Sequence, residues 1–298
     1  GFASEEEWIT ASPIEKEALD YFINNAGSPN GVMEGGIAIF AAGNENAPMA
    51  GYPGAAEYCV SVAATSADFT PATYTNYGPG TTISAPGGDQ DYHFDYLNPI
   101  TNKYGDVGCI LSTLPNHISE SGYGYMEGTS MACPQVSGVI ALGLSYALDQ
   151  RKHFKAQDFI DLLYSTATEV PSSVYDSEKF WYKYVIDMGD NHPNLTPLKP
   201  YKGKMGAGVV NAEALLAAID GTKAAPMTFP NVTLSVDAVR QVNAAIYFEK
   251  GSALNSVTVE NQSIATAEID GNKVVITGKA AGQTTAVVKA GSVEQKFV

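Results

Sequence analysis

Short segments rich in apolar residues recur along the N-terminal part of the chain, the first of them a wholly apolar run between glycines. They cover residues 37–42, 59–65, 81–88 and 109–114. Apolar residues follow one another in these runs rather than alternating with polar ones, which is typical of strands buried on both faces. The pattern therefore predicts the strands of a mainly parallel sheet.

Helical patterns lie between and after these runs. Ser12 is a candidate N-cap and Pro13 suits the first helical position, so a helix is predicted from residue 13. Residues 136–148 are apolar nearly all round, which predicts a helix in the middle of the protein. Segments 156–166 and 211–219 have amphipathic spacing. Strands with intervening and following helices indicate an α/β fold with a parallel sheet.

The pattern changes near residue 222. A linker-like stretch with two prolines is followed by apolar and polar residues in alternation, with a hairpin signal at Asp270-Gly271. The spacing places Val274 and Ile276 on an inward face. We therefore expect an α/β domain over residues 1–222 and, after a linker, a small all-β sandwich within 223–298.

Composition narrows the range of functions. The 298 residues have a net charge of −15, which disfavours a nucleic-acid partner because phosphates would be repelled. The three cysteines are too few and odd in number for a disulfide framework, although two of them could pair. No run of eighteen apolar residues is present, so the sequence predicts no transmembrane segment.

Ser130 lies in a Gly-Thr-Ser-Met-Ala turn that opens into the apolar helical run. A serine at a helix start has unpaired backbone N–H groups around it, and its own N–H can bind a developing oxyanion. The nucleophile elbow of α/β-hydrolases fits poorly, because polar, glycine-rich residues precede the serine and Ala132 stands where the elbow prefers glycine. Downstream partners for that arrangement would be Asp187, Asp190 and His192.

The segment "GTSMACPQVSG", residues 128–138, resembles the nucleophile motif of the subtilase family of serine proteases. The segment "IFAAGNEN" resembles the part of that family that supplies an oxyanion-hole asparagine. The resemblance implies that Ser130 is the nucleophile and that Asn44 and the Ser130 N–H bind the oxyanion. Taken alone, Asn44 would be read as a turn residue.

The resemblance extends over residues 1 to about 220, with 88–108 and 170–204 as insertions of this protein. It implies a peptide-bond hydrolase acting on a polypeptide substrate. It assigns the substrate-binding walls and contacts to Gly1, Phe2, Ala41, Ala42, Gly43 and Thr129.

A general base and an orienting acid are not evident. None of His93, His117, His153 and His192 lies in the His-Gly-Thr context of the family, and an ordinary surface role is expected for each. Subtilisin-type enzymes have the order Asp, His, Ser along the chain. We therefore expect an N-terminal chain of the same protease to supply Asp and His, as a cleavage partner or as sequence not included here. The remaining alternative is a degenerate, non-catalytic surface protein that binds peptides or envelope components.

The C-terminal stretch "SIATAEIDGNKVVITGKAAGQTTAVVKAG" resembles bacterial immunoglobulin-like domains of the Big type. This resemblance implies a secreted or cell-surface bacterial protein in which the module is a spacer or a binding unit. No metal site or certain cofactor is assigned. Calcium stays open because subtilases often bind it, but Asp89, Asp91 and Asp95 are read as an exposed acidic loop rather than a calcium site.

Overall fold

A computed structural model describes the backbone of residues 1–92, 98–184, 191–222, 225–249 and 251–298, and their side chains except at 180–194 and 225–226. The chain forms two compact units, which we describe separately. The first unit consists of Gly1–Ile23, Ile37–Leu142 and Ile160–Ala218. The second unit consists of Asn24–Gly36, Gly143–Phe159 and Ile219–Val298. The predicted division at residues 222 and 223 stays a prediction.

The helices of the described chain are α1 (Glu5–Ala11), α2 (Pro13–Asn25), α3 (Thr129–Asp149), α4 (Ala156–Ser165) and α5 (Ala212–Gly221). The strands up to the end of α5 are β1 (Met33–Glu34), β2 (Ala38–Ala41), β3 (Cys59–Thr65), β4 (Ile83–Pro86), β5 (Ile110–Thr113), β6 (Tyr123–Met126), β7 (Lys152–Lys155), β8 (Glu178–Tyr184) and β9 (Asn191–Pro197). The later strands are β10 (Ala225–Pro226), β11 (Val239–Asn243), β12 (Leu254–Val259), β13 (Ala265–Asp270), β14 (Lys273–Gly278), β15 (Ala286–Ala290) and β16 (Val293–Phe297).

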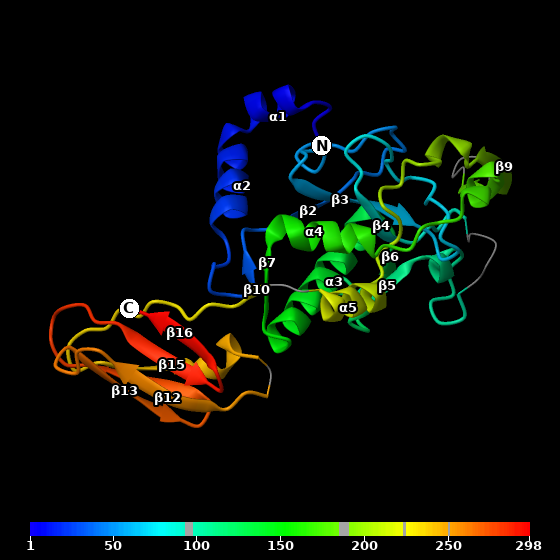
Figure 1. Ribbon diagram of the computed structural model, residues 1–298. Helices are drawn as coiled ribbons and strands as arrows, with labels where there is room; N and C mark the ends of the chain where they lie inside the picture. The colour runs from blue at the N-terminus through cyan, green and yellow to red at the C-terminus, as the bar shows by residue number, and fades with distance from the viewer. Residues whose placement is uncertain (93–97, 185–190, 223–224, 250) are drawn as a thin grey trace. The chain divides into compact units, whose positions relative to one another are not determined.

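The first unit is built on a parallel sheet of order β2-β3-β4 (Figure 1). Every residue of β3 is buried, as the continuous apolar run predicts for a central strand. The prediction for 109–114 needs a correction, because β5 is a strand but forms an antiparallel hairpin with β6. Leu111 in β5 is 55% exposed, so this strand lacks the two buried faces of the parallel sheet.

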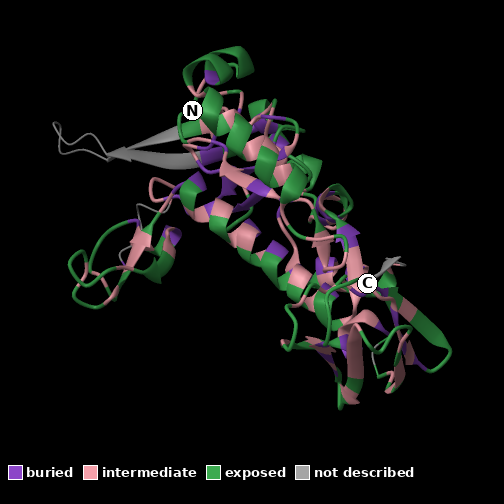
Figure 2. Cartoon of the chain, turned by 90° about the vertical axis from the view of Figure 1, so that its left-hand side faces the viewer, coloured by how far each residue is buried: buried purple, intermediate pink, exposed green. Residues whose placement is uncertain are grey.

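Helices α1 and α2 at the N-terminus are mostly exposed, with Trp8 the buried residue of α1 (Figure 2). Helix α2 begins at Pro13 as predicted. Ser12 is the C-cap of α1, and its carbonyl oxygen accepts hydrogen bonds from Glu15 and Lys16. The side chain of Glu15 accepts a hydrogen bond from the Trp8 indole at 2.8 Å, which joins the two helices.

Helix α3 is only partly enclosed, which corrects the prediction of burial all round. Ala132, Val136, Ile140 and Ala147 are buried, whereas Leu142 is 49% exposed, since no described residue covers that face. By length and composition α3 could also cross a membrane, with a mean hydropathy of 1.4. The core helix of a soluble protein passes the same test, so the absence of a transmembrane segment stays a prediction.

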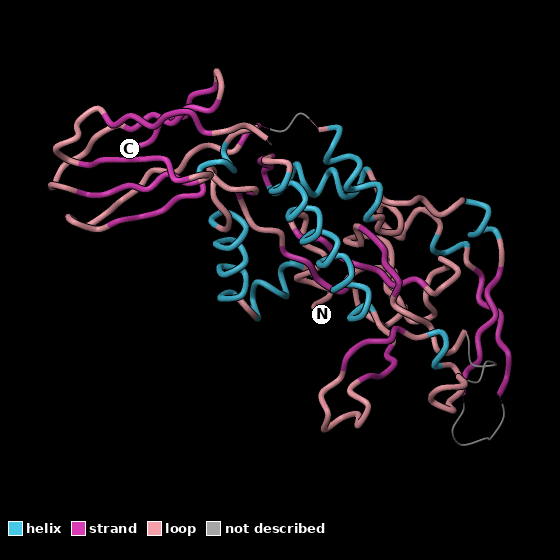
Figure 3. Tube along the Cα trace, turned by 90° about the horizontal axis from the view of Figure 1, so that it is seen from below, coloured by secondary structure: helices cyan, strands magenta, loops and turns pink. Residues whose placement is uncertain are grey.

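The C-terminal part of the second unit contains two antiparallel sheets, of order β11-β14-β13 and β12-β15-β16 (Figure 3). Residues of both sheets share one apolar core, among them Val274, Ile276 and Val288. The hairpin signal is confirmed, because β13 and β14 pair up to Asp270 and Lys273 across a two-residue turn. The immunoglobulin-like assignment stays a prediction.

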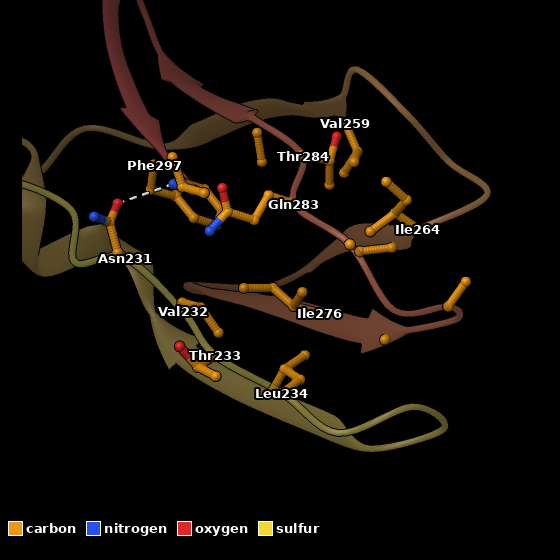
Figure 4. A pocket seen from close by; sticks show the side chains of 16 residues that line it. Asn231, Val232, Thr233, Leu234, Val259, Ile264, Ile276, Gln283, Thr284 and Phe297 are labelled. Atoms are coloured by element: carbon orange, nitrogen blue, oxygen red, sulfur yellow. Dashed lines mark hydrogen bonds between the residues drawn. The ribbon is translucent and has the colours of Figure 1, made fainter.

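A cavity of about 410 Å³ lies beside this core, with Val232, Ile264, Ile276 and Phe297 around it (Figure 4). Its lining is apolar along the strands, with polar side chains such as Gln283 added from a loop. Val274 of the same core, in contrast, is fully buried.

The predicted linker is fixed to the rest of the second unit. Within it, β10 pairs antiparallel with β7. Lys152 in β7 donates to the carbonyl oxygens of Asp220 and Thr222, both at 2.9 Å. The Arg151 guanidinium donates to the carbonyl oxygen of Phe248 at 2.8 Å. The segment after residue 222 therefore has defined backbone and side-chain partners.

Ile276 tests the contribution of the shared core of the two sheets. We expect Ile276→Ala to lower the free energy of unfolding by about 2–5 kcal/mol, because it removes buried methyl groups and leaves a larger cavity. The matched control is Val239→Ala in β11, where the side chain is 59% exposed and the change should be about 0.5 kcal/mol or less. Urea unfolding of both variants gives the comparison, and equal losses would contradict the assigned core.

Candidate active site

Ser130 is the second residue of α3 and is exposed. The turn before it requires glycine, because Gly128 has φ of +142°, where a side chain would be strained. The carbonyl oxygen of Gly128 accepts a hydrogen bond from the Met131 N–H at 2.9 Å and so closes the turn. In the described part of the chain, neither Ser130 Oγ nor its N–H has a hydrogen-bond partner. Both groups are therefore available at the helix N-terminus.

Asn44 comes from the loop after β2 and is held against the same turn. Its side-chain oxygen accepts hydrogen bonds from the Thr129 N–H at 2.9 Å and from the Thr129 hydroxyl at 2.8 Å. The Gly43 N–H in turn donates to the Thr129 hydroxyl oxygen at 3.3 Å. Because the oxygen of the Asn44 amide is occupied, its NH₂ group faces the Gly128 side of the turn, 3.5 Å from where a side chain at Gly128 would begin.

Asn76 organises this loop, a role that was not predicted from the sequence. Its side chain is buried and donates to the carbonyl oxygen of Ala42 at 3.1 Å. Its side-chain oxygen accepts from the backbone N–H groups of Glu45 and Ala47, at 3.0 and 2.9 Å. Asn76 lies in a polar stretch whose residues are typical of turns. Its role in holding the Asn44 loop is therefore visible only in the three-dimensional structure.

A pocket of about 380 Å³ lies beside the Asn44 loop. It brings together five of the residues predicted to bind substrate: Gly1, Phe2, Ala41, Ala42 and Gly43. Phe2 reaches it through paired backbone hydrogen bonds with Tyr52, at 3.1 and 3.0 Å. Thr129 is not part of the lining. Its hydroxyl and N–H donate hydrogen bonds to Asn44 instead. The predicted roles of these residues stay predictions.

The underside of the Ser130 turn is held by Tyr74. The Gly128 N–H donates to the Tyr74 hydroxyl oxygen at 2.8 Å and also to the Gly87 carbonyl oxygen at 3.0 Å. Burial raises the pKa of the Tyr74 phenol, and the nearby charge of Glu127 raises it further. Tyr74 is therefore neutral and can act as donor and acceptor at once.

Glu127 precedes the turn and is half-buried. Its carboxylate accepts a short hydrogen bond from the Gln90 N–H. Burial raises the pKa of Glu127, the hydrogen bond opposes this, and the charges of Asp89 and Asp91 add to the increase. Within the described part of the chain, the Glu127 carboxyl is bound to a backbone N–H group and makes no hydrogen bond with Ser130.

The described histidines do not contact Ser130. His153 belongs to the second unit, where its Nδ1 lies 2.7 Å from the Gly31 carbonyl oxygen, and His117 is exposed between β5 and β6. His93 and the side chain of His192 lie outside the described residues. Among the residues that the structure describes, a general base for Ser130 is therefore not present.

The expectation of an exposed acidic loop is wrong for Asp89. Its side chain is fully buried and pairs with Lys179 at 2.8 Å. Asp95 lies outside the described residues, as does any site that would include it. Over the described residues, no group of three or more His, Cys, Asp or Glu side chains is arranged to hold a metal ion.

The three cysteines are free thiols, so the possible pairing of two of them is not seen, and Cys59 is buried. Cys109 and Cys133 are half-buried. Burial raises the pKa of Cys59 to about 11 and that of Cys109 to about 12, so both are protonated at neutral pH.

Several known proteins are similar in sequence to much of this chain. An extracellular protease of Xanthomonas campestris is 28% identical over 72% of the chain and 30% of its own length. A cell wall-associated protease of Bacillus subtilis is 29% identical over 74% of the chain and 20% of its own length. The halolysin of Haloferax mediterranei is 33% identical over 40% of the chain and 19% of its own length. The chain thus spans less than a third of these relatives.

Among solved structures, a lanthipeptide protease aligns with a TM-score of 0.48 at 20% identity, covering 73% of this chain and 58% of that one. A protease from Pseudoalteromonas arctica aligns with a TM-score of 0.40 at 28% identity, covering 62% and 43%.

The model of the subtilase family matches residues 6–194, which is more than half of the chain and includes the Asn44 loop, the Ser130 turn and the sheet between them. This chain therefore belongs to the subtilase family and is related to serine proteases of that family.

Proposed function

We propose that the protein is a serine endopeptidase that hydrolyses peptide bonds through an acyl-enzyme on Ser130. The observation that most directly supports this proposal is the fixed orientation of the Asn44 side chain. Its amide oxygen accepts two hydrogen bonds from Thr129, and its NH₂ group lies near the Ser130 turn. An amide fixed in this way needs no reorganisation when negative charge develops on a substrate oxygen.

The reaction follows from these positions. Ser130 Oγ attacks the peptide carbonyl carbon and passes its proton to a general base. The oxyanion accepts hydrogen bonds from Asn44 Nδ2 and from the Ser130 N–H. The amine leaves with the proton returned by the base, and water then attacks the acyl carbon and releases the acid and Ser130.

The general base and its orienting carboxylate come from a part of the protein outside these 298 residues. This proposal is supported by the described histidines, which contact other groups or solvent rather than Ser130. An Asp and a His on an N-terminal chain of the same protease would complete the group. The partner of this chain is then that segment, and the substrate is a polypeptide.

The pocket beside Asn44 receives a substrate side chain. Gly43 forms part of its wall, where an added side chain would meet Asn76 Nδ2 at 2.3 Å. Phe40 and Met49 add apolar surface, so a large apolar side chain before the cleaved bond fits best.

We further propose secretion or attachment to the surface of a bacterium. The relatives named as an extracellular protease and as a cell wall-associated protease support this location. The C-terminal sheets then serve as a bacterial immunoglobulin-like module that spaces or stabilises the catalytic part. No observation favours a non-catalytic peptide-binding role, which becomes one outcome of the test below.

Labelling by a fluorophosphonate tests the nucleophile. We expect the full-length gene product to be labelled once, on Ser130, as read by intact-mass and peptide mass spectrometry. Ser130→Ala should remove the label, and Ser137→Ala should not, because Ser137 Oγ donates within α3 to the Cys133 carbonyl oxygen. A protein that keeps both Asp and His but stays unlabelled would instead be the non-catalytic peptide-binding protein.

The oxyanion assignment predicts a loss of kcat rather than of substrate binding. Asn44→Ala should lower kcat by about 10²- to 10³-fold with little change in KM, the scale known for removal of such an amide in a subtilisin. Thr129→Val should have a smaller effect, because it removes one of the two hydrogen bonds that hold Asn44. Peptide hydrolysis by the single and double variants gives the comparison. If Thr129→Val costs as much in the Asn44→Ala background as alone, Thr129 does not act through Asn44.

A further inference from the structure

A buried ammonium group is linked to the Ser130 turn through Asp89. Lys179 is the second residue of β8 in the β8–β9 hairpin, within the segment 170–204 that was predicted to be an insertion, and is 3% exposed. Its Nζ donates to Ser66 Oγ, to the Pro71 carbonyl oxygen and to Asp89 Oδ2, each at 2.8 Å. All three N–H bonds of the ammonium are therefore used.

Asp89 is equally enclosed, because its oxygens accept further hydrogen bonds from the neighbouring loop. The Thr73 N–H donates to Oδ2 at 2.8 Å, and the Thr73 hydroxyl donates to Oδ1 at 3.0 Å. The Tyr92 N–H donates to Oδ1 at 3.2 Å, and the ring of Tyr92 lies 4.2 Å from the ammonium. Burial lowers the pKa of Lys179, whereas the charge of Asp89 raises it. Without Lys179, Asp89 would be a buried charge with no counter-ion.

Two routes lead from Asp89 to the Ser130 turn. Along the chain, Asp89 directly follows Gly87-Gly88, and the Gly87 carbonyl oxygen accepts the Gly128 N–H. Through Thr73, Asp89 fixes the adjacent residue Tyr74, whose hydroxyl lies 2.6 Å from the Gly88 carbonyl oxygen and accepts from the same Gly128 N–H. Both hydrogen bonds on Gly128 therefore depend on segments that Asp89 holds.

We propose that Lys179 is a positioning residue for the nucleophile: its ammonium fixes Asp89, and Asp89 fixes the two segments that hold Gly128, two residues before Ser130. This inference rests on the proposed function, since it assigns the insertion hairpin a part in the same site. The hydroxyl, carbonyl and carboxylate oxygens around the ammonium fix its position on three sides.

The test uses the full-length gene product and the variants Lys179→Met, Tyr74→Phe and their combination. Met keeps an unbranched apolar side chain without the charge, and Phe removes only the hydroxyl. We expect each single variant to lower kcat for a peptide substrate about tenfold, with KM within about twofold, because a misplaced nucleophile slows chemistry more than binding. The double variant should lose little more than Lys179→Met alone, since Tyr74→Phe breaks one of the two routes that Lys179→Met has already loosened.

A second readout does not depend on catalysis. Hydrogen exchange of the Gly128 amide should be faster in both single variants, because Lys179→Met loosens both of its acceptors and Tyr74→Phe removes one of them. The matched control is Lys202→Met, which removes an exposed ion pair with Asp176 at 2.9 Å and should change neither kcat nor this exchange.

The outcomes separate the two proposals. An unchanged kcat per folded molecule in Lys179→Met, or losses that multiply in the double variant, would overturn the positioning role even if the enzyme is active. If the parent protein is inactive, the proposed function fails, and hydrogen exchange alone then tests the positioning role of Lys179. Unchanged exchange of the Gly128 amide in Lys179→Met would reject that role. If Lys179→Met does not fold, Tyr74→Phe decides, because an unaffected kcat and Gly128 exchange in that variant would overturn the route through Tyr74, on which the positioning role depends.

Discussion

The candidate site depends on one carboxamide oxygen that joins two distant segments. Asn44 follows a strand of the parallel sheet, Thr129 begins the long helix, and two hydrogen bonds between them bring the nucleophile and the amide donor together. Each bond alone is worth only about 1 kcal/mol in net stability. Their importance is geometric, because the same contact orients the amide and fixes the first turn of the helix.

The rest of the first unit supports this contact from two sides. Asn76 holds the Asn44 loop through three backbone groups, and Tyr74 holds Gly128. These two side chains lie in one short segment after β3, so a single turn of chain braces both the amide donor and the serine. The exposed reacting groups thus rest on the buried Asn76 and the half-buried Tyr74, whose polar side-chain groups have hydrogen-bond partners inside the protein.

Local patterns predicted much of this arrangement, and long-range pairing explains the remainder. The continuous apolar run of β3 and the turn chemistry around Ser130 are properties of consecutive residues, so the strand and the helix start could be predicted from sequence. Asp89 was misread because nothing nearby in sequence reveals its partner Lys179, which is 90 residues away. The antiparallel pairing of β5 with β6 was missed for a related reason, because a short apolar run predicts a strand but not the strand with which it pairs or their relative direction.

The tethering of β10 has a consequence for how this protein can be shortened. Removing the chain after residue 222 would take away the strand that covers one edge of β7 and the carbonyl oxygen that binds Arg151. An uncovered strand edge can pair with the same edge of another molecule. The shortened protein would thus be prone to self-association, whereas a protein that keeps β10 has that edge of β7 protected.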